Sequence, residues 1–413
     1  MSRFLSSSVL INVASVAAAI AIFVAPFRAS AGLRGAMLVI AALVIVCAYA
    51  RAGQLAHLLP KAKFLALAVG LWLLAATLWS FAAPQPMASL SVVKRDILTP
   101  ILACLVFYAL TRTRADMLRW LAVLTLSLAI LTVMIIRDPF DPLATLQESD
   151  YLTVGLLTTW IVTLAPLMAV LLFASRPWRA RARLLAIIVL PCLLISAWLS
   201  GNRTVWVCFA SMLIVAAVLA TRARAHALMI PKRTIATLAV ALGVLAMFMF
   251  AAMQYRADTQ APSGTTALGF LLHDSRAPIL RAAVEMIIER PWQGLGYANP
   301  QIHDAFAARF DLPWLRNYVH HPHNVVLNHM LQMGFIGGLV ILLLFAALAQ
   351  TFITKSRAVG LTRFAGLCGA ALVVGVFLRN MTDDFFQRHT VQFFGAAVGM
   401  LLGLAARRPP LTG

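Results

Sequence analysis

The residues best suited to chemistry lie where a loop meets an apolar helix. Three histidines, His320, His321 and His323, crowd a turn that contains a proline, and the helix is expected to begin at Asn324. The first turn of a helix leaves backbone N–H groups unpaired and carries partial positive charge, which favours a neutral imidazole. A neutral imidazole can accept a proton near pH 7. The pattern therefore predicts a general base, with His323 and His321 as the candidates.

Two other roles stay open for these histidines. They could cap the helix or lie in interfacial water, because histidines at purely structural sites also have perturbed titration. They could also bind zinc, since His303 and His329 are near in the sequence. No cysteine accompanies them, and the motif shows no carboxylate that could orient a metal ligand. We therefore predict no metal and no cofactor.

A second chemical signal is an arginine in a tight turn between two apolar runs. The turn, Ser-Gly-Asn-Arg-Thr over residues 200–204, sets Arg203 at the end of one expected membrane span and at the start of the next. A guanidinium together with helix N-terminal N–H groups makes a strong phosphate site. The alternative is an arginine that snorkels to the membrane surface between Trp198 and Trp206.

A third signal is an amphipathic segment at residues 275–290, inside the longest stretch without an apolar run. Arg276 is expected in its first turn and Arg281 in its second, where cations oppose the helix dipole. This mismatch indicates that Arg276 meets an anion. The segment is too short and too charged to span a bilayer, so we expect it to lie at the membrane surface. Its predicted apolar face consists of Ile279, Leu280, Ala283, Val284, Ile287 and Ile288.

Two cations near the outer end of an early span are weaker candidates. Lys94 and Arg95 close the outer loop that starts at Pro84. They either bind an anion or form an interfacial pair that Asp96 partly neutralises.

The last outer loop contains two adjacent carboxylates, Asp383 and Asp384. Paired aspartates are typical of metal sites and general bases. We favour mutual pairing with Arg379 and Arg388, because charges at the edge of a membrane usually pair with one another.

The composition sets the fold class. Of the 413 residues, 62% are hydrophobic and only 12% are charged, far more apolar than an average soluble domain. Runs close to the roughly 20 residues that cross a bilayer recur along the chain. This predicts an all-α, polytopic integral membrane protein with about 12 transmembrane helices. The runs lie near residues 9–26, 36–50, 64–83, 93–110, 118–136, 151–174, 183–199, 204–220, 234–253, 325–349, 361–379 and 390–406.

Charge follows topology rather than nucleic-acid binding. The formal net charge is +20, and placing both termini in the cytoplasm makes the inner loops strongly basic and leaves nearly all acidic residues outside. A basic inner face contacts anionic lipid head groups. The five cysteines fall in predicted spans, which argues against a disulfide framework and against thiol catalysis.

The runs divide the chain into three parts. Residues 1–253 hold spans one to nine, residues 254–324 form one large outer loop that ends in the histidine motif, and residues 325–413 hold the last three spans. A loop of that length in a compact protein is usually functional.

Three motifs in a fixed order carry a family resemblance. The turn that ends in Arg203 is followed by DSRAPILRAAVEMIIERPWQGLGY at 274–297 and by HPHNVVLNHMLQMGFIGG at 321–338, before a terminal set of spans. This combination resembles the O-antigen ligase and polymerase superfamily, and within it the O-antigen ligases. The resemblance implies a GT-C-like bundle with one large periplasmic loop that carries short amphipathic helices. It also implies that no metal or nucleotide is required.

The resemblance further implies a reaction and a place for it. The donor is a glycan linked to undecaprenyl diphosphate, the acceptor is lipid A-core oligosaccharide, and transfer takes place at the periplasmic face of the bacterial inner membrane. His323 corresponds to the catalytic histidine, with His321 as its neighbour in an unusually histidine-rich motif, while Arg203 and Arg276 correspond to the diphosphate-binding arginines. Lys94, Arg95, Arg281, Asp383 and Arg379 are secondary candidates. Membrane lipids are the other expected partners, nucleic acid is not one, and a monomer is expected.

Other functions fit parts of the same pattern. An O-antigen polymerase or a protein O-oligosaccharyltransferase belongs to the same superfamily, although polymerases tend to have two sizeable periplasmic loops. A transporter of an anionic substrate is the alternative from another class. Transporters are expected to show internal repeats with broken helices in matching positions, and this chain shows no repeat.

Overall fold

A computed structural model describes most of the membrane-embedded chain. The residues it describes are 7–27, 30–137, 148–172, 179–200, 202–222, 276–299, 301–310 and 321–406, with single residues at 243, 247, 250 and 251.

Helices account for the regular structure of the described residues, which contain no strand. Each predicted span coincides with a helix except 234–253, which lies mostly outside the described residues. The elements are α1 (Ser7–Phe23), α2 (Ala31–Arg51), η2 (Leu55–Leu58), α3 (Lys63–Phe81), α4 (Pro86–Val93), η3 (Lys94–Leu98), α5 (Thr99–Leu110), α6 (Arg114–Arg137), α7 (Glu148–Leu172), α8 (Arg179–Leu199), α9 (Arg203–Arg222), α12 (Arg276–Glu289), α13 (Gln301–Ala307), α15 (Val325–Ser356), α16 (Gly360–Thr382) and α17 (Arg388–Ala405).

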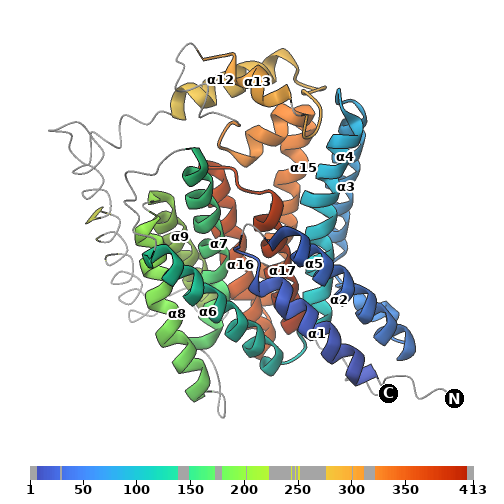
Figure 1. Ribbon diagram of the computed structural model, residues 1–413, viewed down its shortest axis with the longest axis vertical. Coiled ribbons are helices and arrows are strands. Elements are labelled where there is room, and N and C mark those ends of the chain that lie inside the picture. Colours follow the sequence, from blue (N-terminus) through green and yellow to red (C-terminus); the bar gives the residue numbers. More distant parts are fainter. Residues whose placement is uncertain are drawn as a thin grey trace.

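Several of these helices can cross a membrane. Among the described residues, 7 are long and apolar enough to do so, namely α2, α3, α6, α8, α9, α15 and α16. Two shorter apolar helices occupy Ser8–Phe23 and Gly155–Met168. The chain is therefore a multi-pass membrane protein, and the number of about twelve spans stays a prediction. The helices pack side by side, while α12 and α13 lie across one end of the bundle, which we call the α12 end (Figure 1).

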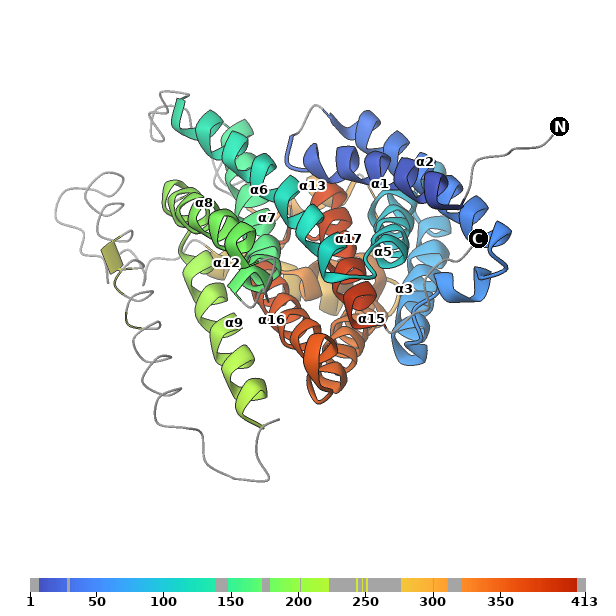
Figure 2. The ribbon, with the colours of Figure 1, turned by 90° about the horizontal axis from the view of Figure 1, so that it is seen from below.

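Helix α17 forms the centre of the bundle. It lies between α5 and α16 (Figure 2), and its residues from Thr390 to Ala405 are buried. Glycines at four-residue spacing face α5, where a Cβ on any of them would clash with a backbone carbonyl oxygen of α5. Small residues at this spacing let two membrane helices approach closely. The glycines are Gly395, Gly399 and Gly403.

The expected outer loop from Pro84 to Asp96 is wrong, because most of it is helical. Helix α4 begins at Pro86, and η3, a single π-helical turn, joins it to α5. The π turn has a local cause in Pro100, which has no N–H to donate within the helix. The π turn shifts the pattern so that the N–H of Thr99 reaches the carbonyl of Lys94.

Helix α15 is two helical segments rather than the continuous helix that we predict from the apolar run. Its backbone breaks at Met333 (φ −127°, ψ 16°) and Gly334 (φ 65°, ψ −162°). The turn at residues 291–296 takes up the backbone groups that the break frees. The N–H of Leu295 donates to Leu331 O at 2.9 Å, the N–H of Gly296 to Gln332 O at 3.0 Å, and the N–H of Phe335 to Pro291 O at 2.7 Å. Gly294 and Gly296 in this turn both have positive φ, which glycine adopts without steric cost.

Gly334→Ala is expected to destabilise the fold by about 2 kcal/mol or more, because its φ and ψ lie in a region that only glycine occupies readily. A Cβ at this position would also lie 2.5 Å from the carbonyl oxygen of Pro291. Thermal unfolding in detergent measures the effect. Gly70→Ala in α3 is the matched control, since nothing lies within 4 Å of its added Cβ and alanine favours a helix. An equal Tm for the two variants would contradict the prediction.

The predicted apolar face of α12 is partly wrong. Val284 and Ile288 are exposed by 42% and 67%, whereas Ala282 and Met286, which the prediction omits, are buried. The buried stripe packs against apolar side chains of α13, the residues after it and α15, not against a bilayer. The stripe consists of Ile279, Ala282, Ala283, Met286 and Ile287, and its partners are Ile302, Phe306, Phe310 and Leu331. A membrane-surface position for α12 stays a prediction.

Candidate active site at the α12 end

His323 lies just before α15, in the turn that leads into the helix, as the sequence predicts. Asn324 is the N-cap, and its Oδ1 accepts hydrogen bonds from the N–H groups of Val326 and Leu327, both at 3.0 Å. The N–H groups that we expect to act on the histidine are thus satisfied by a side chain. His323 has φ 54°, which is uncommon for a residue other than glycine.

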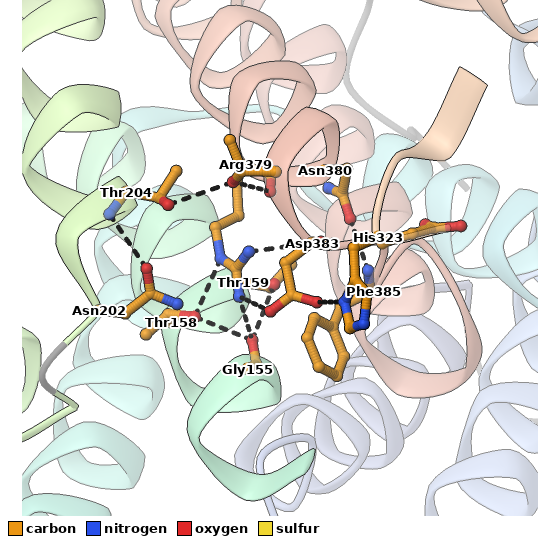
Figure 3. Close-up of polar contacts among 12 residues, drawn as sticks. Gly155, Thr158, Thr159, Asn202, Thr204, His323, Arg379, Asn380, Asp383 and Phe385 are labelled. Carbon is orange, nitrogen blue, oxygen red and sulfur yellow. Dashed lines mark hydrogen bonds and ion pairs between the residues drawn. The ribbon is translucent and has the colours of Figure 1, made fainter. Parts of the chain in front are cut away.

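A buried carboxylate holds the imidazole of His323. The Nδ1 atom of His323 lies 2.7 Å from Oδ1 of Asp383, which is only 1% exposed (Figure 3). Burial acts to raise the pKa of Asp383, but the hydrogen bond from His323 and the positive charge of Arg379 outweigh it, so this pKa lies well below its usual value. An ionised carboxylate only accepts hydrogen bonds. The Nδ1 atom of His323 therefore donates this hydrogen bond, and in a neutral imidazole with this tautomer the lone pair belongs to Nε2.

Arg379, on the last turns of α16, supplies the positive charge beneath Asp383. Its side chain is fully buried, and Nη2 lies 3.3 Å from Oδ2 of Asp383. The guanidinium also donates to Oγ1 of Thr158 at 3.0 Å and to the carbonyl of Gly155 at 3.3 Å, both in α7. This confirms the expected pairing of Asp383 with Arg379. Asp384, by contrast, accepts a hydrogen bond from Nδ2 of Asn328 at 2.5 Å.

His321 supports His323 from the other side. Its Nδ1 atom accepts a hydrogen bond from the backbone N–H of His323 at 3.1 Å, and the two ring centroids are 4.4 Å apart. This contact helps to fix the unusual backbone of His323. His321 is half-buried beside the hydrogen-bonded pair of His323 and Asp383.

The structure changes the argument about metal binding. Ligand atoms of His321, His323 and Asp383 lie within 4.8 Å of one another, which is a donor set suited to a divalent transition metal. The motif itself contains no carboxylate, but the fold supplies one, because Asp383 comes from a loop sixty residues further along the chain. The charge of Arg379 beside Asp383 opposes a dication here. The wider histidine group is not assembled among the described residues, since His303 pairs with Asp304 and Nδ1 of His329 bonds its own helix.

Arg203 lies at the same end of the bundle. It is the first residue of α9 and is half-buried, and Asn202 caps the helix by accepting from the N–H of Thr204 at 3.0 Å. Oγ1 of Thr382 donates to Oγ1 of Thr204 at 3.1 Å, which ties this helix start to the residue before Asp383 (Figure 3). The helix N-terminus that carries Arg203 is thus joined to the residue next to Asp383, at the same end of the bundle as the carboxylate–histidine pair.

The other predicted cations are placed less directly. Arg95 forms an ion pair with Asp96 through contacts of 2.7 and 2.9 Å, which agrees with the alternative in which Asp96 partly neutralises this pair of cations. Asp96 also accepts from the backbone N–H of Arg388 at 2.9 Å, which joins η3 to the start of α17. Lys94 is exposed on the same turn, and Arg281 is exposed on α12. Arg276 begins α12, but its side chain lies outside the described residues.

The sequence does not point to the residues of α7 that accept hydrogen bonds from Arg379. Thr158 and Gly155 come from the middle of an apolar run, and no local pattern links them to Arg379. Asn324, Asn328 and Gln332 recur at four-residue spacing in α15, and this signal was available in the sequence. The assembled geometry can orient an imidazole and stabilise its positive charge after it accepts a proton, which is the role of a buried carboxylate beside a general base.

Comparison with known proteins agrees with the position of this site. Residues 190–342 match the family model described as O-antigen ligase, a segment that contains Arg203, His321 and His323. No curated protein matches the chain. Residues 190–342 are therefore similar to the O-antigen ligase family, and this match supports a relationship of the chain to the O-antigen ligase superfamily.

Proposed function

We propose that this protein is an O-antigen ligase that transfers glycan from undecaprenyl diphosphate to lipid A-core oligosaccharide. The O-antigen ligase domain supports, at a coarse level, an enzyme of the membrane glycosyltransferase type. The observation that carries the proposal furthest is the contact of His323 with the buried Asp383, which Arg379 stabilises. This arrangement fits a base that must deprotonate a sugar hydroxyl.

The base is His323, acting through Nε2. Asp383 accepts a hydrogen bond from Nδ1–H and so fixes the tautomer in which Nε2 can take the proton of an acceptor hydroxyl. The negative charge of Asp383 then stabilises the imidazolium that forms. His321 positions the backbone of His323.

The leaving group is the diphosphate of the carrier lipid. The acceptor oxygen forms a bond to the anomeric carbon, the bond from that carbon to the diphosphate oxygen breaks, and its electron pair leaves on the diphosphate. Attack from the face opposite the diphosphate inverts the anomeric configuration. Arginines can stabilise the developing phosphate charge through paired hydrogen bonds, so no metal is needed for this step. Arg203 and Arg276 take this role, with Lys94, Arg95 and Arg281 as secondary contacts.

The reaction takes place at the α12 end of the bundle. We assign this end to the periplasmic face of the bacterial inner membrane, with both termini in the cytoplasm and residues 254–324 as the periplasmic loop. The polyprenyl carrier and the acceptor lipid both lie in that leaflet, and the protein acts as a monomer.

Arg203→Ala is expected to lower kcat/KM for glycan transfer by about 10²- to 10³-fold, because one donor to the developing diphosphate charge is lost. The measurement uses purified protein with lipid-linked donor, lipid A-core acceptor and a chelator. Arg357→Ala is the matched control, since Arg357 is an exposed arginine that follows the other end of α15. Transfer by the wild type is expected to survive chelation, and a requirement for added metal would count against the mechanism.

The same assay separates the alternative functions. A polymerase would lengthen glycan on the carrier without the lipid A-core acceptor, and an oligosaccharyltransferase would modify a protein instead. A transporter would exchange substrate across vesicles and form no new glycosidic bond.

A further inference from the structure

Three amide side chains form a ladder on the first segment of α15. Asn324, Asn328 and Gln332 are four residues apart, so they lie on one face of the helix, between His323 and the break at Gly334. Amides inside an apolar helix are costly unless they are hydrogen-bonded. Each amide here forms a hydrogen bond with a residue outside α15.

The ladder links a turn above the bundle to the loop that carries Asp383. The backbone N–H of Ala298 donates to Oε1 of Gln332 at 2.9 Å, and Nε2 of Gln332 donates to Oδ1 of Asn328 at 3.1 Å. Nδ2 of Asn328 then donates to Oδ2 of Asp384 at 2.5 Å. Nearer the start of the helix, Nδ2 of Asn324 donates to the carbonyl of Met381 at 3.1 Å.

Asp384 also forms hydrogen bonds that fix the residues next to it in the chain. It is 4% exposed, and its second oxygen accepts from the N–H of Phe386 at 3.0 Å. Loss of the donor from Asn328 would leave a buried charge short of a hydrogen bond, which costs more than an exposed one. Asp384 directly follows Asp383, so a shift of this loop moves the carboxylate that holds His323.

Docking of the turn does not by itself need the Gln332 side chain. Backbone bonds from Leu295 and Gly296 already fix the turn to α15. The side chain adds the bond to Ala298, whose φ of 50° is uncommon for a residue with a Cβ, and it alone continues the chain of hydrogen bonds to Asn328. The particular contribution of the Gln332 side chain is therefore the hydrogen-bonded connection between Ala298 and Asn328.

We propose that Gln332 and Asn328 are positioning residues that couple the turn at residues 291–298 to the Asp383–His323 pair through Asp384. What that pair does chemically rests on the proposed function, whereas the coupling itself does not. A substrate that displaces the turn would, through this ladder, shift Asp384 and with it the Asp383 carboxylate that holds His323.

Hydrogen–deuterium exchange tests the coupling without any substrate. Gln332→Leu is expected to speed exchange about tenfold in peptides that cover residues 383–387, because the bonds to Asp384 lose their support. Gln350→Leu is the matched control, since it is the same change at an exposed position near the other end of α15. Unchanged exchange at 383–387, with faster exchange only at 294–299, would overturn the proposal.

Gln332→Glu separates the two ends of the ladder. A carboxylate still accepts from the N–H of Ala298 but cannot donate to Asn328. Exchange is expected to rise at 383–387 and to stay at the wild-type rate at 294–299. This variant also decides the question if Gln332→Leu fails to fold. Wild-type exchange in both segments would mean that the connection carries no coupling.

Kinetics provide the functional readout. Gln332→Glu is expected to lower kcat about tenfold and to leave KM for the donor lipid unchanged, because the base is misplaced while the phosphate-binding arginines are not. A rise of KM by the same factor, with kcat unchanged, would contradict a positioning role. If the wild type transfers no glycan, the proposed function fails, and the exchange measurements still decide whether the coupling exists.

Discussion

His323→Gln is expected to lower kcat for glycan transfer by about 10³-fold while the protein stays folded, because general-base catalysis typically contributes 10²- to 10⁴-fold. Glutamine can still donate to Asp383, so the buried carboxylate keeps a partner and the loss reports chemistry rather than unfolding. Initial rates with saturating donor and acceptor measure kcat, and thermal unfolding of the same samples verifies the fold.

His321→Gln tests which histidine is the base. We expect a loss of less than about tenfold, because His321 acts on the backbone of His323 and a glutamine oxygen can accept the same hydrogen bond. His303→Gln on α13, where the histidine side chain is 40% exposed, controls for the substitution itself. Full activity in His323→Gln together with inactive His321→Gln would assign the base to His321.

The sequence predicts the helices well because hydrophobic length is a local property. The apolar runs coincide with helices wherever the structure describes them, and the predicted start of α15 at Asn324 is confirmed as an N-cap. The break at Gly334 is not visible in the run, because its cause is a turn at residues 291–296 that is distant in sequence. An apolar pattern shows that a segment is kept away from water. It does not show which backbone groups of another segment form hydrogen bonds with it.

The site was predictable only in part for the same reason. The histidine motif and Arg203 stand out as polar groups at the ends of apolar runs, where water and ligands have access. The partnership of His323 with Asp383 crosses sixty residues, and Thr158 looks like any threonine in a membrane helix. In α12, two apolar stripes compete, and periodicity alone cannot tell which one faces protein: Val284 and Ile288 fit the pattern but are exposed.

Arg379→Leu is expected to reduce stability by about 3–5 kcal/mol, because removal of one partner leaves a buried charge uncompensated. Asp383 is almost fully buried, and the lost guanidinium also bonds Thr158 and Gly155 of α7. Unfolding in detergent with a chemical denaturant measures the difference. The double variant Arg379→Leu with Asp383→Asn is expected to recover part of the loss, since it removes the charge as well. A double variant no more stable than Arg379→Leu would show that Arg379 acts mainly through packing.

The pH dependence of this defect follows from the depressed pKa of Asp383. In the wild type, a folded-state pKa below the unfolded value gives stability that is present above the unfolded pKa and is lost as pH falls through the folded one. Without Arg379, less positive charge offsets the effect of burial, so the pKa of Asp383 rises. Protonation of Asp383 then removes the uncompensated buried charge. The Tm difference between wild type and Arg379→Leu is therefore expected to narrow as pH falls towards the unfolded-state pKa of Asp383. A difference that stays constant as pH falls would mean that the charge of Asp383 does not cause the defect.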